Sequence, residues 1–323
     1  MFSIFFVFID LKIGYTAEAL EYYSTTLGLV TLYYHFYILK FTPHSFLLMA
    51  SFSDPDQPAR FAAQKAADDS RALRIEEHYQ PGRLAGLRIL ITGSNRGIGL
   101  SLAKEAVAAG ARVIGACRKT SDELNAAGVE QIIEGIDVTS DTSMNKLVAE
   151  INEPLDVVVN NAGYFMKEKE TVLGGTMDFA DEMKTINICA IGPLRITNAL
   201  WHGQKIKSPN GKVIFISSQG GSIQWRDTQC PDGGDYGHHM SKAAENMAAK
   251  LVANELKGKA LVGILHPGFN RTEMTSKYSH IWDIEGAVEP EIGAKRVLHE
   301  INLLSEQTSG KFINCEDGLE IPW

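Results

Sequence analysis

One short stretch, GGDYGHHMSKAAENM at residues 233–247, gathers side chains that could transfer a proton. It contains Tyr236, two histidines and Lys242 at the start of a helical pattern. A helix brings two side chains onto one face when they lie three or four residues apart. Tyr236 precedes Lys242 by six residues, whereas His238 precedes it by four. The spacing therefore places an imidazole, and not a phenol, beside the lysine.

A second stretch, ILITGSNRGIGLSLAKEAVAAG, carries glycines where a strand pattern changes into a helix pattern. Gly93 allows a tight turn, and Gly97 and Gly99 let the backbone approach a pyrophosphate. The free N–H groups and partial positive charge of a helix N-terminus favour phosphate there. Glycine suits any such turn, but a dinucleotide site requires this strand–turn–helix order. We expect the turn to bind a nucleotide through Thr92, Gly93, Asn95, Arg96, Gly97, Ile98 and Gly99.

The end of the second strand pattern indicates which nicotinamide dinucleotide would bind. A site that prefers NAD places a carboxylate there for the ribose 2′-hydroxyl. Here the sequence is GACRKTSDEL, with Arg118 and Lys119 and no acid before Asp122, and Arg96 adds a cation on the same side. A guanidinium fits a phosphate well. The sequence therefore predicts NADP as the cofactor; in the alternative, Arg118 is only a solvated surface charge.

Alternating apolar and amphipathic segments from Leu87 onward must position these groups. Apolar runs rich in Val and Ile predict strands at residues 87–92, 111–117, 131–138, 155–163, 212–218 and 261–268. Helical patterns cover residues 99–110, 140–152 and 241–258. Strands that are buried on both faces and alternate with helices form a parallel sheet covered on each side. The expected fold is α/β, a doubly wound parallel sheet of the Rossmann type.

The composition narrows the class of function. The chain has 323 residues, 45% hydrophobic and 22% charged, with a net charge of -8. This is typical of a soluble protein, and the acidic balance argues against nucleic acid or an acidic membrane as the main partner. The cysteines, Cys117, Cys189, Cys230 and Cys315, are scattered without a CxxC pair. We expect reduced thiols, a cytoplasmic location and no metal site.

The N-terminal part of the chain has a different character. Residues 1–48 hold aromatic and apolar runs that charged residues interrupt, short of the roughly 18 apolar residues of a membrane-spanning helix. We expect an extension outside the fold, with a targeting or anchoring segment as the alternative. Residues 49–85 are polar and are expected to form a helical or loose arm. The α/β domain is then expected at residues 86–323.

Further motifs follow the glycine turn in order: Asp137-Val138, Asn160-Asn161-Ala162-Gly163, Asn187, Ser217-Ser218, SKAA at residues 241–244, and Pro267-Gly268. On these motifs together, residues 86–323 resemble the short-chain dehydrogenase/reductase family. The segments HPGFNRTEM and SGKFINCEDGLEIPW resemble the branch of C-factor and sniffer-type carbonyl reductases. The resemblance implies an NADP-dependent oxidoreductase that interconverts carbonyl compounds and their alcohols.

The resemblance also implies a role for each matching residue. The residues expected to hold the adenine and nicotinamide ends of the cofactor are Asp137, Val138, Asn161, Ala162, Gly163, Pro267, Gly268 and Thr272. Asn187 would hold a water in the proton relay, Ser218 would bind the substrate carbonyl, and Lys242 would bind the nicotinamide ribose. In the family a tyrosine four residues before the lysine protonates the substrate, and the lysine charge lowers its pKa.

Three interpretations of proton transfer stay open because that tyrosine position is His238. In the first, His238 is the acid, since an imidazole titrates near pH 6.5, although Lys242 would lower its pKa and leave it mostly neutral. In the second, Tyr236 reaches in from a glycine-containing loop, because a regular helix would turn it roughly 120° away from Lys242. In the third, the site binds NADP but is slow or inactive, and the protein has a signalling or scaffold role.

Two segments are expected to enclose the substrate. Residues 219–235 would form one wall and residues 270–290 a lid. Apolar and aromatic surface would come from Trp225, Met274, Tyr278 and Trp282. Such a surface favours an apolar carbonyl or alcohol substrate. Members of the family often pair subunits through long helices, so a homodimer or homotetramer is expected.

Overall fold

The computed structural model describes residues 52–166 and 168–323. The interpretations of residues 1–48 fall outside these described residues. One sheet of parallel strands has the order β3-β2-β1-β4-β5-β6-β7, with β1 (Arg88–Thr92), β2 (Arg112–Cys117), β3 (Gln131–Glu134), β4 (Val157–Asn160), β5 (Gly211–Ile216), β6 (Ala260–His266) and β7 (Phe312–Asn314). The order reverses between β1 and β4, which creates a crevice at the carboxyl ends of these strands. The predicted doubly wound sheet is confirmed.

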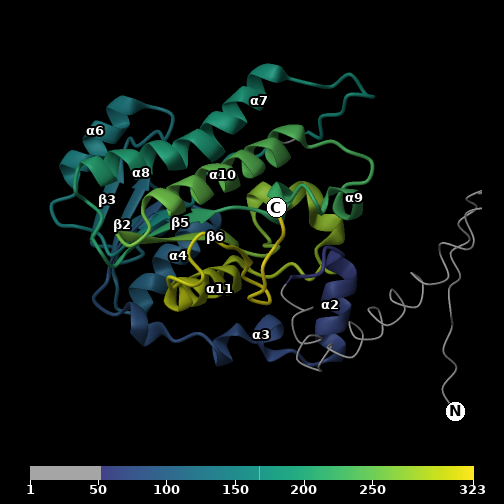
Figure 1. Ribbon diagram of the computed structural model, residues 1–323, viewed down its shortest axis with the longest axis horizontal. Coiled ribbons are helices and arrows are strands. Elements are labelled where there is room, and N and C mark those ends of the chain that lie inside the picture. Colours follow the sequence, from purple (N-terminus) through teal and green to yellow (C-terminus); the bar gives the residue numbers. More distant parts are fainter. Residues whose placement is uncertain (1–51, 167) are drawn as a thin grey trace, which may run out of the picture. The chain divides into compact units, whose positions relative to one another are not determined.

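Helices cover both faces of the sheet (Figure 1). The main ones are α4 (Gly97–Ala108), α6 (Asp141–Glu150), α7 (Phe179–Ile186), α8 (Gly192–His202), α10 (Tyr236–Glu255) and α11 (Pro290–Leu303). Successive strand residues point to opposite faces, so Ile89 and Ile91 pack toward α4 and α11. Leu90, between them, packs toward α6, α8 and α10. Two apolar cores thus hold the strands, and the strand ends carry the polar residues.

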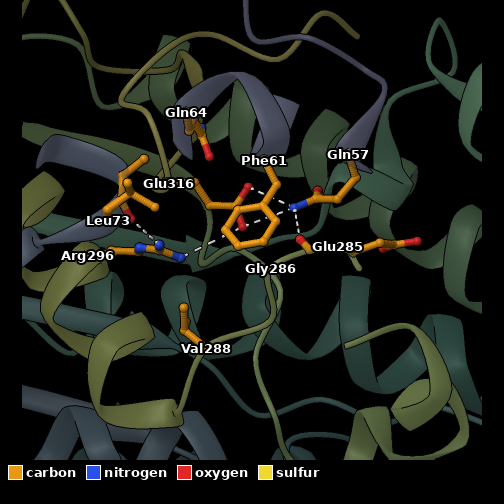
Figure 2. A pocket seen from close by; sticks show the side chains of 10 residues that line it. Gln57, Phe61, Gln64, Leu73, Glu285, Gly286, Val288, Arg296 and Glu316 are labelled. Atoms are coloured by element: carbon orange, nitrogen blue, oxygen red, sulfur yellow. Dashed lines mark hydrogen bonds and ion pairs between the residues drawn. The ribbon is translucent and has the colours of Figure 1, made fainter. Parts of the chain in front are cut away.

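The segment before the first strand is helical and packs against the domain. It contains α2 (Gln57–Ala66) and α3 (Ser70–Leu73). Arg60 donates to Glu316 at 2.8 Å, and both side chains are only 5% exposed. Figure 2 shows Gln57 and Arg296 approaching Glu316 from different sides of a cavity of about 70 Å³. Of the two alternatives for the arm, helical or loose, the described part has the helical form.

The buried carboxylate of Glu316 anchors this segment electrostatically. Burial alone would raise its pKa, but Arg60 and Arg296 lower the pKa to about 2. Glu316 is therefore ionised at neutral pH, inside the protein. The segment from Phe52 and the C-terminal residues of the chain thus form part of one folded unit.

Among the described residues, none of the helices combines the length and apolar character that crossing a membrane requires.

Candidate active site

Helix α10 brings His238 to a serine at the end of a strand. Its Nε2 lies 3.2 Å from Ser218 Oγ. Ser218 follows β5, and its Oγ accepts a hydrogen bond from the backbone N–H of Gly220 at 3.0 Å. His238 and Lys242 lie on one face of α10, because both belong to the helix and are four residues apart. A serine hydroxyl, an imidazole and an ammonium group therefore lie in one neighbourhood.

Tyr236 points elsewhere. It is the first residue of α10 and follows Asp235, which has a left-handed backbone with φ of 49°. A Cβ built on Gly233 would lie 3.7 Å from the Tyr236 hydroxyl, so this hydroxyl lies beside the preceding loop. Of the two candidate proton donors, the structure brings His238 into contact with Ser218 and keeps Tyr236 out of that contact.

Two acceptors hold the Lys242 ammonium. It donates to the backbone carbonyl of Ile216 at 2.8 Å and to Glu245 Oε2 at 2.7 Å. Burial would lower the pKa of Lys242, but Glu245 outweighs this and raises the pKa. Burial raises the pKa of Glu245 to about 7, against the pull of Lys242. The sequence analysis missed Glu245, although an acid three residues after the lysine was a visible signal.

The imidazole of His238 is held in its neutral form. Burial lowers its pKa well below the usual value, and the charges of His239 and Lys242 lower it further. Lys277 and Arg226 act in the same direction. The sequence predicted the effect of Lys242, but the larger cause is burial, which depends on the tertiary packing.

Asn187 lies at a break between two helices. Residues Asn187–Ile191 form a single π-helical segment between α7 and α8, which packs against α10. The side-chain oxygen of Asn187 accepts a hydrogen bond from Arg195 at 3.5 Å. Its backbone carbonyl accepts from Gly192. Such π-bulges occur frequently at functional sites, and this one lies against the helix that carries His238 and Lys242.

The glycine turn is packed as a phosphate site would require. A Cβ on Gly99 would lie 2.2 Å from the carbonyl oxygen of Gly93 and 2.4 Å from Asn161 Nδ2, so a side chain has no room there. Gly97 has a φ of 54°, and a Cβ there would face the methyl group of Thr272 at 3.8 Å. Helix α4 begins at this glycine without a side-chain cap. Its first N–H groups therefore lack a side-chain acceptor, as N–H groups that bind an anion do.

Hydrogen bonds join the ends of β1 and β4 beside this turn. Thr92 Oγ1 accepts the backbone N–H groups of Asn161 and Ala162, each at 3.1 Å. Asn161 Nδ2 in turn donates to the Thr92 carbonyl at 2.9 Å. These contacts fix the floor of the crevice. Gly163 comes next in the chain, and a Cβ built on it would lie 3.9 Å from Met274 Cε.

The remaining predicted cofactor residues line or border the same edge of the sheet. Pro267 and Gly268 follow β6, and a Cβ on Gly268 would lie 2.7 Å from Glu316 Cγ.

Asp137 accepts hydrogen bonds from Thr139 N at 2.8 Å and Thr139 Oγ1 at 2.7 Å, which lower the pKa of its carboxyl. The adjacent Val138 is buried. The Asn95 carbonyl accepts from Ser121 Oγ at 2.8 Å, and Ile98 packs partly on the core.

The two predicted phosphate-binding arginines are exposed. Arg118 follows β2 directly, at the carboxyl end of that strand. Arg96 forms an ion pair with Glu273 at 2.8 Å, in which the side chains are 64% and 76% exposed. Exposed pairs of this kind contribute little to stability, so this contact leaves Arg96 available to a phosphate.

One residue that was predicted to line the substrate wall lies in the core instead. Trp225 is 2% exposed in the core, with Arg60 above its ring, so it cannot contact a substrate. The aromatic surface near the site comes instead from Phe165, which the sequence analysis missed. Its ring centroid lies 4.5 Å from His238 and 6.1 Å from Tyr278. No sequence pattern near Phe165 predicts its contact with His238, because the loop after β4 reaches α10 only in the folded protein.

A buried aspartate joins the segment that was predicted to be a lid to the start of α10. Asp235 Oδ1 accepts from Lys277 Nζ at 2.8 Å, and Asp235 Oδ2 accepts from the Tyr278 hydroxyl. The ammonium of Lys277 also lies 3.9 Å from the Phe165 ring centroid. The predicted lid residue Met274 is 47% exposed, whereas the ring of Trp282 lies under Arg271.

Among the described residues, no cluster of three or more His, Cys, Asp or Glu side chains could hold a metal ion.

A doubly wound sheet with a glycine turn and an uncapped helix N-terminus at its switch point is a dinucleotide-binding fold. The family model "short chain dehydrogenase" matches residues 88–281. The chain belongs to this family of oxidoreductases, which confirms the resemblance of its motifs.

Individual relatives agree with this assignment. A 1-hydroxy-2-glutathionyl-2-methyl-3-butene dehydrogenase from Rhodococcus sp. (strain AD45) is 30% identical over 241 residues, 73% of this chain and 99% of that enzyme. The C-signal of Myxococcus xanthus is 32% identical over 176 residues, 53% of this chain and 93% of that protein. The crystal structure of an NADPH-bound carbonyl reductase from chicken fatty liver superposes with a TM-score of 0.64 and 25% identity, covering 74% of this chain and all of that one.

Proposed function

We propose that this oxidoreductase uses NADP to interconvert a carbonyl compound and its alcohol, with His238 as the group that transfers the proton. The observation that carries the proposal is the 3.2 Å contact between His238 Nε2 and Ser218 Oγ. A carbonyl oxygen that lay beside this pair, within hydrogen-bond distance of both atoms, would accept one hydrogen bond from each. Lys242, one turn along the same helix face, would bind the nicotinamide ribose.

The residues around the crevice support NADP as the cofactor. The uncapped start of α4 offers N–H groups to the pyrophosphate, and Arg118 stands exposed where the ribose 2′-phosphate would lie. The NADPH-bound carbonyl reductase has the same fold over its whole length. Within this arrangement Thr272 and Pro267 would cover the nicotinamide, and Asp137 would contact the adenine.

The chemistry divides between cofactor and protein. The bound nicotinamide supplies a hydride to the carbonyl carbon during reduction, or takes one from the alcohol carbon during oxidation. In reduction, a protonated His238 releases the Nε2 proton to the substrate oxygen while Ser218 donates a hydrogen bond to that oxygen. In oxidation, the neutral imidazole accepts the proton of the hydroxyl group. Asn187 would hold a water that connects this site with solvent.

The neutral state of His238 gives the two directions different requirements. Because burial holds its pKa well below the usual value, most of the imidazole is neutral at neutral pH and little of it carries the proton. Alcohol oxidation uses the abundant neutral form, whereas carbonyl reduction uses the scarce protonated form. Carbonyl reduction gains rate as the pH falls.

A second candidate is a weakly active or inactive NADP-binding protein with a signalling or scaffold role. The observation in its favour is the same depressed pKa of His238, since a site without an available acid reduces carbonyls slowly. Both candidates bind NADP, so binding alone does not separate them.

Turnover with each nucleotide tests the proposal. Purified protein is assayed with NADPH and NADH against aldehydes, ketones and quinones, and with NADP⁺ and NAD⁺ against the matching alcohols. Apolar aromatic substrates are included because Phe165 and Tyr278 lie beside His238. We expect turnover that prefers the phosphorylated nucleotide. Binding of NADPH without any turnover supports the inactive alternative, and equal use of both nucleotides removes the assigned role of Arg118.

A further inference from the structure

A buried carboxylate lies behind the lysine of this site. Glu245 is 1% exposed and accepts a hydrogen bond from Lys242 Nζ at 2.7 Å. The same ammonium donates to the carbonyl of Ile216, where β5 ends. Lys242 is thus held between the sheet and its own helix. We propose that Glu245 is a positioning residue of the active site, which fixes the Lys242 ammonium and offsets its charge toward His238.

The spacing of these residues places them in line. His238, Lys242 and Glu245 are separated by four and three residues on α10, so they lie along one face of the helix. The charged groups that oppose a positive charge on His238 are His239 and Lys242 from α10, Lys277 from residues 270–290 and Arg226 from α9 (Arg226–Gln229). Two carboxyl groups also face the start of α10: Glu170 Oε1 accepts the backbone N–H of Gly237 at 2.9 Å, and Asp235 precedes the helix. Glu245 supplies negative charge to this face through its contact with Lys242.

Asp235 does not supply this charge. Its two carboxylate oxygens are engaged by Lys277 and by the hydroxyl of Tyr278. On the other side of Lys242, Cys189 from the π-helical segment is buried, and burial raises the pKa of its thiol, which keeps it uncharged. Glu245 is therefore the carboxyl group in direct contact with the lysine among the described residues, and its raised pKa of about 7 makes its negative charge complete only above that pH.

Stability alone gives little reason for a carboxylate at this position. A buried ion pair is often no more stabilising than apolar side chains of similar volume, because both charges lose their hydration. A tyrosine four residues before a lysine benefits from an unopposed ammonium, which favours the phenolate. The same ammonium lowers the pKa of an imidazole at that position, because the protonated imidazole is a cation. A carboxylate that offsets the lysine suits the histidine.

The inference rests on the proposed role of His238, and a pair of substitutions tests it. Glu245→Gln keeps the size of the side chain and removes its charge, and Glu245→Leu removes both charge and polarity. Either variant is sufficient if the other fails to fold. Glu255→Gln removes one charge from the exposed end of the same helix and is the matched control. Thermal unfolding and NADPH fluorescence titration establish that each variant is folded and binds the nucleotide.

The readout is the pH profile of both reaction directions. We expect Glu245→Gln and Glu245→Leu to lower, by about one unit, the apparent pKa in the kcat/KM profiles, above which carbonyl reduction declines and below which alcohol oxidation declines. The overall equilibrium fixes the ratio of the two kcat/KM values at each pH, so the same displacement appears in both profiles. Glu255→Gln matches the wild type in both directions.

Other results overturn the inference. A loss of rate that is the same at every pH, with the apparent pKa undisplaced, means that Glu245 has only a structural role and that its charge does not act on His238. A wild-type protein that binds NADPH without turnover removes the proposed function and this inference together. Active wild-type protein with unaffected variants removes the inference alone.

Discussion

The residue at position 238 decides how the neighbouring lysine acts. An ammonium group stabilises a phenolate but destabilises an imidazolium. Lys242 would therefore activate a tyrosine and hinders His238 as an acid. Burial works in the same direction and lowers the pKa of His238 further. At neutral pH His238 is consequently mostly in the form that accepts a proton from an alcohol, and little of it is in the form that donates one to a carbonyl.

Substitution at the two candidate proton donors separates their roles. We expect His238→Ala to lower kcat at least about 100-fold in both directions, the usual loss when a general acid or base is removed. Tyr236→Phe is the matched control, because its hydroxyl lies beside Gly233 and away from Ser218, and it should retain wild-type activity. Steady-state kinetics with saturating NADP(H) give the comparison. A loss confined to Tyr236→Phe would assign the proton to the phenol instead.

At the scale of elements, the turn between β1 and α4 leaves no space for a side chain. A Cβ on Gly99 meets backbone and amide atoms within 2.4 Å. Such contacts cannot be relieved by rotating a flexible side chain, so the turn itself must shift. The shift would move the N–H groups at the start of α4 away from a bound pyrophosphate.

We therefore expect Gly99→Ala to weaken NADPH binding at least about tenfold and to lower stability by about 1–3 kcal/mol through overpacking. Gly82→Ala is the control, since a Cβ there meets nothing within 4 Å and should change stability by less than about 0.5 kcal/mol. Fluorescence titration and urea unfolding measure the two effects. Equal behaviour of the two variants would contradict the close packing of the turn.

The segment before β1 makes a second element-scale prediction. Arg60→Met removes one of the two arginine partners of the buried Glu316 carboxylate. Loss of one partner of a buried pair costs about 3–5 kcal/mol. Lys65→Met on the exposed side of the same helix should leave the unfolding midpoint unchanged.

The sign of the pH dependence follows from Glu316. Its pKa is lowered to about 2 in the folded state, below the ordinary value of 4.5. Its stabilisation is therefore complete above pH 4.5 and is lost as the pH falls toward 2. The difference in unfolding free energy between wild type and Arg60→Met should shrink over that range. A constant difference would show that Glu316 is not the group involved.

The sequence predicted the elements whose pattern is local. Continuous Val- and Ile-rich runs identify β1 to β6 because these strands are buried on both faces. Strand β7 was missed, since it has three residues and gains its place only from pairing with β6. The packing of α2 was missed for a similar reason. Arg60 and Glu316 are 256 residues apart, and no local pattern links them.

The same division holds within the site. The four-residue spacing on one helix placed His238 beside Lys242, and the resemblance to the family pointed to Ser218. Phe165 depends on contacts between distant elements, which no local pattern shows. Glu245 lies three residues after Lys242, but its burial could not be predicted from that spacing. Trp225 shows the opposite error, because an aromatic residue in a presumed pocket wall is in fact buried in the core.

At the scale of the whole molecule, one surface suits the pairing of subunits. Helices α7, α8 and α10 lie side by side over one face of the sheet (Figure 1). Apolar side chains on α7 and α10 are exposed, namely Phe179 (73%), Met183 (64%), Met240 (43%), Met247 (63%) and Leu251 (55%). Exposed apolar surface of this kind marks an interaction site. It supports the proposal of a homodimer or homotetramer built on these helices.

We expect the double variant Met247→Glu/Leu251→Glu to shift the protein to a smaller oligomer, because two charges would be buried at the contact. Leu303→Glu, an equally apolar and 49% exposed position on α11, is the control and should keep the wild-type mass. Size-exclusion chromatography with light scattering reads out the mass. A monomeric wild-type protein would contradict the proposed pairing.

The central claim is that a neutral, partly buried imidazole transfers the proton, and the pH dependence of kcat/KM tests it most directly. Carbonyl reduction should rise about tenfold for each pH unit between pH 8 and 6, since it needs the scarce imidazolium, while alcohol oxidation stays level. A reduction rate that is constant over this range and falls only near pH 10 would indicate a phenol as the donor, and would contradict the account.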